Sequence, residues 1–171
     1  MSERPTVGFE SERLVMRPWT IADAEAFHRI WADPRVIFWG SASKTLEETR
    51  GALGRVIARC DEQPGLGWFA VVDRATGESV GNVVLQPAPF HAGVEIGWHF
   101  EHRVWGRGYA TEAARAALAH AFGALRLEQI VAAILPDNLR SKRVAEKAGL
   151  RPIGMVTHAS LLHELWEITA G

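Results

Sequence analysis

Apolar residues recur along the chain with two different periods, and each period predicts one type of element. Alternating apolar and polar residues, or a short continuous apolar run, are typical of β-strands. Seven segments have one of these patterns: residues 12–19, 67–73, 79–87, 93–100, 128–136, 150–158 and 163–169. The second and third segments predict one hairpin, and the last two predict another. Within 93–100 the alternation places Val94, Ile96, Trp98 and Phe100 on one face and Glu95, Gly97 and His99 on the other.

Four further segments are expected to be helical. They are residues 21–33, the segment that follows Thr45, residues 110–121 and residues 139–148. Two N-termini resemble the capping box of a helix start: Thr20 with Asp23, and Thr45 with Glu48. Asp137 or Asn138 would cap the last helix, which would end at Gly149.

The order of these elements predicts an α+β fold, or equally an α/β fold with antiparallel parts, as one domain over residues 1–171. The strand–helix–strand–helix run from Gly93 to Ala148 predicts a parallel crossover. Hairpins elsewhere in the chain make the expected sheet mixed.

Composition narrows the class of protein. The 19 Lys and Arg residues nearly balance the 20 Asp and Glu residues. This balance argues against a nucleic-acid-binding domain, which usually has a basic excess. The sequence has no apolar run of the about 20 residues that span a membrane and no apolar signal-peptide core, so we expect a cytoplasmic protein without a membrane partner. The single cysteine, Cys60, excludes an internal disulfide. The histidines are scattered without helical zinc spacing, so no metal site is expected.

A glycine-rich turn, Gly106-Arg107-Gly108, comes directly before the alanine-rich helix. Backbone amides at a helix start, together with the helix dipole, favour a phosphate, and Arg107 adds a positive charge. The alternative is a tight turn whose glycines only permit positive φ. Two known phosphate-binding motifs are absent: no Gly-Lys-Ser/Thr occurs, and the dinucleotide motif lacks its third glycine and its acidic residue.

A third pattern fits better. The loop pattern [QR]-x-x-G-x-[GA] is matched by Gly108 and Ala110, with Trp105 in its first place. The pattern N-x-x-S-x-x-V-x-E-K-x-G-[FL] is matched by Asn138, Ser141, Val144, Glu146, Lys147, Gly149 and Leu150. In this order and spacing the chain resembles the GNAT superfamily of acyl-CoA-dependent N-acyltransferases, and most of all its branch of RimJ and RimL N-acetyltransferases. The resemblance covers nearly the whole chain.

The resemblance implies a mixed central sheet with splayed parallel strands, flanked by about four helices, with acetyl-CoA as cosubstrate and no metal. The pyrophosphate of the coenzyme would bind the amides of 105–110, and its pantetheine arm would fill the gap between strands 94–100 and 129–134. Asn138 would bond this arm, although helix capping is an alternative role. The coenzyme-binding residues implied are Trp98, Phe100, Val104, Trp105, Gly106, Arg107, Gly108, Tyr109, Ala110, Asn138 and Ser141.

The catalytic residues are where the sequence departs from the family. In many members a tyrosine seven places after the asparagine serves as the general acid. Here Ala145 stands at that place, and the only tyrosine in the sequence, Tyr109, lies on the glycine loop. We expect Ser141 to protonate the leaving thiolate in its place; simple packing or a bond to the coenzyme are its alternative roles. Glu95 and His99 are the candidate general bases. A solvated outer face is the alternative for Glu95, and His99 has the more suitable unperturbed pKa.

The acceptor site is expected between the first two helices and the final hairpin. Phe38 and Trp39 would line it, or would instead pack beneath their loop. The acceptor would be a primary amine, either a protein N-terminus or a small molecule, that attacks directly in a ternary complex. A non-catalytic acyl-CoA-binding module and a nucleotide-cofactor oxidoreductase are the competing functions, and a second copy of the chain is a candidate partner.

Overall fold

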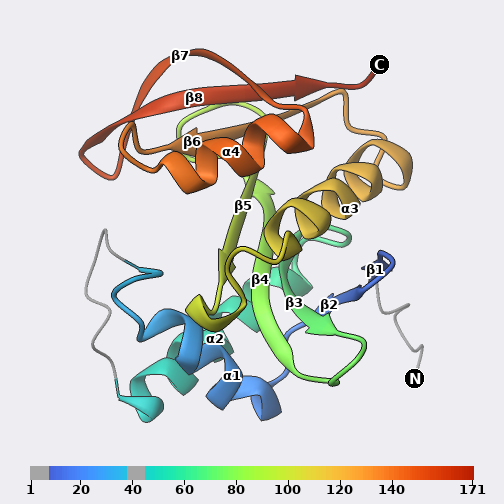
Figure 1. Ribbon diagram of the computed structural model, residues 1–171, viewed down its shortest axis with the longest axis vertical. Helices are drawn as coiled ribbons and strands as arrows, with labels where there is room; N and C mark the ends of the chain where they lie inside the picture. Colours follow the sequence, from blue (N-terminus) through green and yellow to red (C-terminus); the bar gives the residue numbers. More distant parts are fainter. Residues whose placement is uncertain (1–7, 38–44) are drawn as a thin grey trace.

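The computed structural model describes residues 8–37 and 45–171, whose strands form one eight-stranded sheet (Figure 1). The strand order is β1-β2-β3-β4-β5-β6-β8-β7. The strands are β1 Phe9–Glu10, β2 Leu14–Pro18, β3 Gly67–Asp73, β4 Ser79–Pro87, β5 Val94–Phe100, β6 Gln129–Ile134, β7 Arg151–His158 and β8 Leu161–Thr169. All neighbours are antiparallel except β5 and β6, which are parallel. The expected mixed α+β fold is confirmed.

Two pairs of helices accompany the sheet. The helices are α1 Ala24–Trp31, α2 Leu46–Asp61, α3 Tyr109–Gly123 and α4 Leu139–Ala148. Helices α1 and α2 pack together against one face of the sheet, where Ala70 belongs to their apolar cluster. Helix α3 packs its alanine face, from Ala113 to Ala121, on the opposite side against β2 to β5, and α4 lies beside it (Figure 1).

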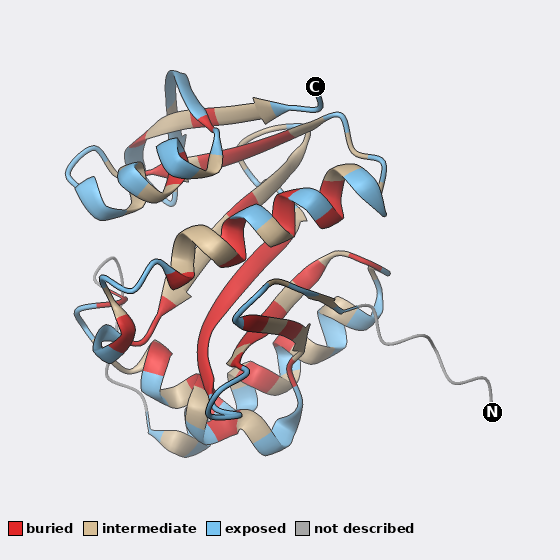
Figure 2. Ribbon diagram, turned by 45° about the vertical axis from the view of Figure 1, so that its right-hand side comes forward, coloured by how far each residue is buried: buried red, intermediate tan, exposed pale blue. Residues whose placement is uncertain are grey.

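The middle of the sheet is the core of the molecule. Strand β4 is buried from Ser79 to Leu85, and buried residues concentrate on the central strands and on the inner faces of the helices (Figure 2). Exposed residues lie on the outer helix faces and in the β7–β8 hairpin. The strands that position the site described below are therefore rigidly supported on both faces.

Strands β5 and β6 pair only at one end. Val94 is opposite Ile130 and Glu95 is opposite Val131, and no further pair joins the two strands. Strand β5 remains paired with β4 from Val94 to Phe100, and β6 remains paired with β8 from Gln129 to Ile134. The two strands thus diverge after Glu95, as expected, and each keeps an unpaired edge that faces the other.

The helix starts agree with the sequence patterns, with small differences. Both capping boxes form, but the first opens a 3₁₀ turn, Ile21–Asp23, rather than the α-helix itself. Asn138, not Asp137, caps α4, and Gly149 ends it with a φ of 98°. The two-residue β1 was not expected, because an element so short has no readable period. Within the part of the chain that the structure describes, no helix is long and apolar enough to cross a membrane.

Candidate active site

A cavity of about 1320 Å³ opens where β5 and β6 diverge. Its walls are the exposed edges of these strands, the loop before α3, the first turns of α4 and the tip of the β7–β8 hairpin. This volume exceeds that of a typical site for a drug-sized ligand, about 300–1,000 Å³, so the cavity suits a long ligand. The unpaired edges of β5 and β6 offer backbone hydrogen-bond groups along it.

The glycine loop forms one end of this cavity. Gly106 and Gly108 both have a φ of 78°, in the left-handed region that other residues adopt only at a cost. Gly108 is the N-cap of α3, and it has no side chain to bond the amides of the first helical turn. These amides therefore need an acceptor from elsewhere, and the dipole of the 15-residue helix favours an anion there.

Arg13, just before β2, holds this loop from behind. Its Nη1 donates to the Arg107 carbonyl at 3.0 Å, and its Nε donates to Glu112 Oε2 at 2.6 Å. The Tyr109 hydroxyl donates to Asp73 Oδ2 at 2.8 Å. The main chain around Gly108 is therefore fixed by side chains outside the cavity.

The side chains of two residues expected at the coenzyme, Tyr109 and Arg107, interact with Asp73, and their contact with a coenzyme stays a prediction. Tyr109 lines the cavity, but its hydroxyl bonds Asp73 and is not directed at a ligand. Arg107 alone among residues 104–110 does not line the cavity, and its charge acts on Asp73. The carboxylate of Asp73 thus attracts both side chains.

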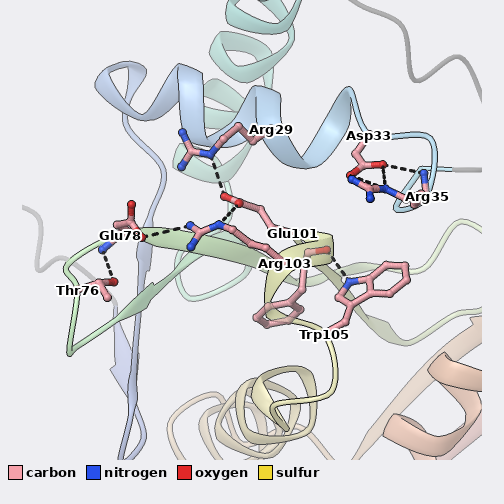
Figure 3. Close-up of polar contacts among 9 residues, drawn as sticks. Arg29, Asp33, Arg35, Thr76, Glu78, Glu101, Arg103 and Trp105 are labelled. Carbon is pink, nitrogen blue, oxygen red and sulfur yellow. Dashed lines mark hydrogen bonds and ion pairs between the residues drawn. The ribbon is translucent and has the colours of Figure 1, made fainter.

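The first half of the loop is fixed through β5 (Figure 3). Glu101 accepts hydrogen bonds from Arg29 Nε at 3.0 Å and from Arg103 Nε at 2.6 Å, which ties the end of β5 to α1. The indole nitrogen of Trp105 donates to the Phe100 carbonyl at 2.9 Å. Across the cavity, the guanidinium of Arg140 on α4 lies 4.4 Å from the centre of the Trp105 ring.

Three other residues expected at the coenzyme line the cavity to different degrees. Phe100 and Val104 are buried in the core, and the Phe100 ring packs against Gly81. Both also line the cavity. Trp98 is half-buried and lines the cavity, as do Gly106 and Ala110.

Asn138 and Ser141 lie at the start of α4, on the cavity wall. Asn138 Oδ1 accepts from the Ser141 amide at 3.2 Å, so the capping role is present, and its Nδ2 makes no hydrogen bond within the described residues. Ser141 is half-buried, and its hydroxyl likewise bonds none of the residues that the structure describes. Ala145, farther along the same helix, is fully buried.

Glu95 and His99 lie on the face of β5 that α1 and α2 cover, rather than on a solvated face. Burial raises the pKa of Glu95, while a 2.6 Å hydrogen bond from Gln86 Nε2 to its Oε1 works against the rise. Burial lowers the pKa of His99 to about 4. His99 Nδ1 is 3.4 Å from Asn82 Nδ2, and its ring centre is 4.8 Å from that of Trp31.

Aromatic residues that sequence reasoning missed complete the site. Trp31 and Trp68 stack with ring centres 5.0 Å apart, and both line the cavity next to His99. His158 and His163 line it from the β7–β8 hairpin. Nothing in the helical pattern marks Trp31 as a site residue, and only the packing of α1 against the sheet brings it beside Trp68. Phe38 and Trp39, expected at the acceptor site, lie outside the described residues.

The residues of this cavity can bind an elongated anion and can accept a proton at Glu95. A family model described as an acetyltransferase (GNAT) domain matches residues 13–151. The chain belongs to the GNAT acetyltransferase family. Acetyl-CoA is the cosubstrate of GNAT acetyltransferases, and the slot, the unpaired strand edges and the amides of α3 fit its extended arm and its pyrophosphate. Within the described residues, no three His, Cys, Asp or Glu side chains gather as a metal site.

This GNAT chain is similar to several known proteins. The Bacillus subtilis (strain 168) protein YkkB, itself uncharacterised, is 36% identical over 129 residues, or 74% of each chain. The crystal structure of a GNAT-family acetyltransferase from Bacillus anthracis has a TM-score of 0.80 and 29% identity, and covers 95% of this chain and 98% of its own. The structure of Mycobacterium smegmatis RimJ in complex with CoA-disulfide has a TM-score of 0.79 at 23% identity, covering 96% and 87% of the two chains, and so shares the fold.

Proposed function

We propose that the protein is an N-acetyltransferase of the RimJ/RimL-like branch, active in the cytoplasm as one domain over residues 1–171. It moves the acetyl group of acetyl-CoA to a primary amine by direct attack in a ternary complex. The observation that carries the proposal is the slot between the unpaired edges of β5 and β6, which shares its cavity with the free amides of α3. A flexible arm that ends in a thioester at one end and a pyrophosphate at the other requires both features.

The coenzyme would lie along this slot. Its pyrophosphate accepts hydrogen bonds from the amides of residues 105–110, and its pantetheine amides pair with the edge of β5. Asn138 Nδ2 donates to the arm while Oδ1 continues to cap α4. Three cations line the cavity from α4, namely Arg140, Arg143 and Lys147, and they suit the remaining phosphate charge of the coenzyme.

The chemistry needs one bond made, one broken and two protons moved. The amine nitrogen, in its neutral form, attacks the thioester carbon, and the C–S bond breaks. Glu95 receives the proton that the nitrogen loses, because a carboxylate with a raised pKa is a better base than an exposed one. Ser141 donates a proton to the departing sulfur, directly or through water, so that the products are an amide and the free coenzyme thiol. The proton that Glu95 received then passes through water to Ser141, which restores both side chains.

The acceptor would enter on the side of α1. Trp31, Trp68 and His99 form a largely aromatic wall there, and no acidic cluster accompanies Glu95 among the residues that line the cavity. This wall favours an amine on an apolar body, whether a small molecule or a protein N-terminus, over a polycation. Phe38 and Trp39 remain proposed members of the same site.

The main competing function is an acyl-CoA-binding module that does not turn over. Ala145 favours this alternative, because it stands where many relatives place a catalytic tyrosine. Incubation of the protein with acetyl-CoA and a panel of apolar, peptide and polyamine acceptors distinguishes the two functions. We expect free thiol to appear only with an amine present, together with an acceptor mass increased by one acetyl group. Coenzyme binding without amine-dependent thiol release would contradict the proposed transfer and support the module.

A further inference from the structure

Two amide side chains on β4 stand directly opposite the two candidate bases on β5. Gln86 is the cross-strand partner of Glu95, and Asn82 is the cross-strand partner of His99. Each amide also accepts a hydrogen bond from a tryptophan. Trp68 Nε1 donates to Gln86 Oε1 at 2.8 Å, and Trp19 Nε1 donates to Asn82 Oδ1 at 2.8 Å.

The tryptophans determine which way each amide points. An indole nitrogen can only donate, so the amide atom that faces it must be the carbonyl oxygen. The NH₂ group of each amide is then turned to the opposite side, toward β5. If either amide were flipped, two N–H groups would face each other at hydrogen-bond distance, which costs free energy in a buried site. Asn82 is fully buried and Trp19 is 3% exposed, so water cannot relieve such a clash.

For Glu95, a fixed donor favours the ionised form. Gln86 Nε2 lies 2.6 Å from Glu95 Oε1, the short distance of a bond to a charged acceptor. An ionised carboxylate only accepts hydrogen bonds, so the donor stabilises the state that can take up a proton. Gln86 therefore offsets part of the rise that burial causes in the pKa of Glu95.

For His99, the same arrangement has the opposite consequence. Asn82 Nδ2 can only donate, so His99 Nδ1 must accept, and the neutral ring carries its proton on Nε2. At 3.4 Å the contact is long, but a proton on Nδ1 would place two donors face to face. The protonated imidazolium, which has N–H groups at both positions, is disfavoured for the same reason.

We propose that these two tryptophan–amide pairs divide the proton chemistry of the site between the two residues of β5. Gln86 and Trp68 are positioning residues that keep Glu95 the proton acceptor, and Asn82 and Trp19 keep His99 a neutral donor through Nε2–H. His99 is then not a general base. The catalytic meaning of this division rests on the proposed function, but the protonation states do not.

Other charged groups share the cavity and belong to any account of its pH dependence. From outside β5, the cavity is lined by Arg35, Asp137, Arg140, Arg143, Lys147, His158 and His163. None of them contributes to the shifted pKa of Glu95, for which burial and Gln86 are the causes. A change in the titration of Glu95 on substitution of Gln86 is therefore attributable to the side chain at position 86.

Isosteric variants test the proposal, because Gln86→Glu and Asn82→Asp keep the tryptophan bond and replace the donor by an acceptor. Carboxyl-carbon NMR follows Glu95, and ring-nitrogen NMR reports which nitrogen of His99 is protonated. In the wild type we expect the His99 proton on Nε2. Gln86→Glu should raise the pH at which Glu95 titrates by at least about one unit, with the acidic limb of kcat/KM moving equally, since a second carboxylate disfavours ionisation. Asn82→Asp should move the His99 proton to Nδ1 and leave Glu95 unchanged.

Trp68→Phe supplies the graded case, since it keeps an aromatic ring but removes the N–H that orients Gln86. We expect Trp68→Phe to raise the pH at which Glu95 titrates as well, but by less than Gln86→Glu does. A wild-type His99 with its proton on Nδ1, or a Glu95 titration indifferent to Gln86→Glu, would overturn the proposal. These NMR measurements need no turnover. The expected signatures in a protein that releases no thiol with any amine would contradict the proposed function and leave the protonation assignment intact.

Discussion

The guanidinium of Arg13 lies over the ring of Tyr109, with its carbon 4.6 Å from the ring centre. Arg13 precedes the second strand, whereas Tyr109 opens α3 almost a hundred residues later. The same guanidinium bonds the Arg107 carbonyl and pairs with Glu112 at 2.6 Å. Arg13 therefore joins the first strands of the sheet to the turn 106–108 and to the first turn of α3 without lining the cavity.

Replacement of Arg13 by alanine should weaken coenzyme binding although the residue is remote from the ligand. Loss of the bond to the Arg107 carbonyl frees the main chain around Gly108, and one such hydrogen bond is worth about 1 kcal/mol, or roughly fivefold in Kd. Titration with acetyl-CoA by calorimetry measures the change. Arg74→Ala is the matched control, because Arg74 bonds Ser11 and Glu10 on the same edge and does not contact the loop. Equal affinities in the two variants would show that Arg13 does not support the turn.

Gly108→Val should abolish coenzyme binding while the protein remains folded. Gly108 has a φ of 78°, which costs a residue with a side chain roughly 1–2 kcal/mol and a β-branched one more. An added Cβ would also lie 3.6 Å from Arg13 Nη2, so a β-branched side chain would press on the guanidinium that holds the loop. The control is Gly123→Ala at the far end of α3, where nothing lies within 4 Å of an added Cβ. Thermal melts with and without acetyl-CoA give the result: Gly123→Ala should keep the ligand-induced rise in Tm, and Gly108→Val should lose it.

Most of the fold could be predicted because its signals are local. The strand 94–100 alternates strictly, and the capping boxes of Thr20 and Thr45 need only residues three places apart. The divergence of β5 and β6 came from the resemblance to a family, since nothing in either strand announces where their pairing ends. The turn 106–108 could be identified as a candidate site because its two glycines lie directly before a helix start, which is a local pattern.

The electrostatic detail of the site could not be predicted, because it depends on pairings distant in sequence. Gln86 meets Glu95 only through the register of β4 against β5, and a slip of one residue would turn it to the other face. The same holds for Asp73 at the end of β3, which accepts a hydrogen bond from the Tyr109 hydroxyl. The sequence therefore predicted both Glu95 and His99 as candidate bases, with His99 having the more suitable unperturbed pKa, and their neighbours on β4 make the two residues different.

Tyr109→Phe should reduce stability at neutral pH by about 1 kcal/mol, the net value of a typical hydrogen bond, and this difference should shrink in acid. The Tyr109 hydroxyl bond is the main cause that holds the pKa of Asp73 below its ordinary value. A depressed carboxyl pKa stabilises the folded state at pH values above the unfolded pKa of about 3.9, and the contribution is lost as the pH falls through the folded value. Urea unfolding of both proteins at pH 7 and near pH 3 measures the difference. A gap that persists unchanged in acid would mean that the hydroxyl acts by packing alone.

Ser141→Ala is the variant that best separates catalysis from binding. Asn138 and Ser141 stand one turn apart at the start of α4, and both line the cavity. The hydroxyl of Ser141 bonds none of the described residues, so its removal leaves no protein group unpaired there. As the proposed acid, Ser141 should contribute a factor typical of one general acid, so kcat should fall by at least about 100-fold with little change in coenzyme affinity.

The contrast with Asn138→Ala gives that result its meaning. Asn138 Oδ1 caps α4 and its Nδ2 is proposed to hold the pantetheine arm, so Asn138→Ala should lower both stability and coenzyme affinity. Steady-state kinetics combined with direct binding measurements show whether each variant loses kcat or coenzyme affinity. If Ser141→Ala behaves like Asn138→Ala, the serine binds the coenzyme and the thiolate leaves by another route. If neither kcat nor affinity changes, the proton that the sulfur takes up does not come from Ser141.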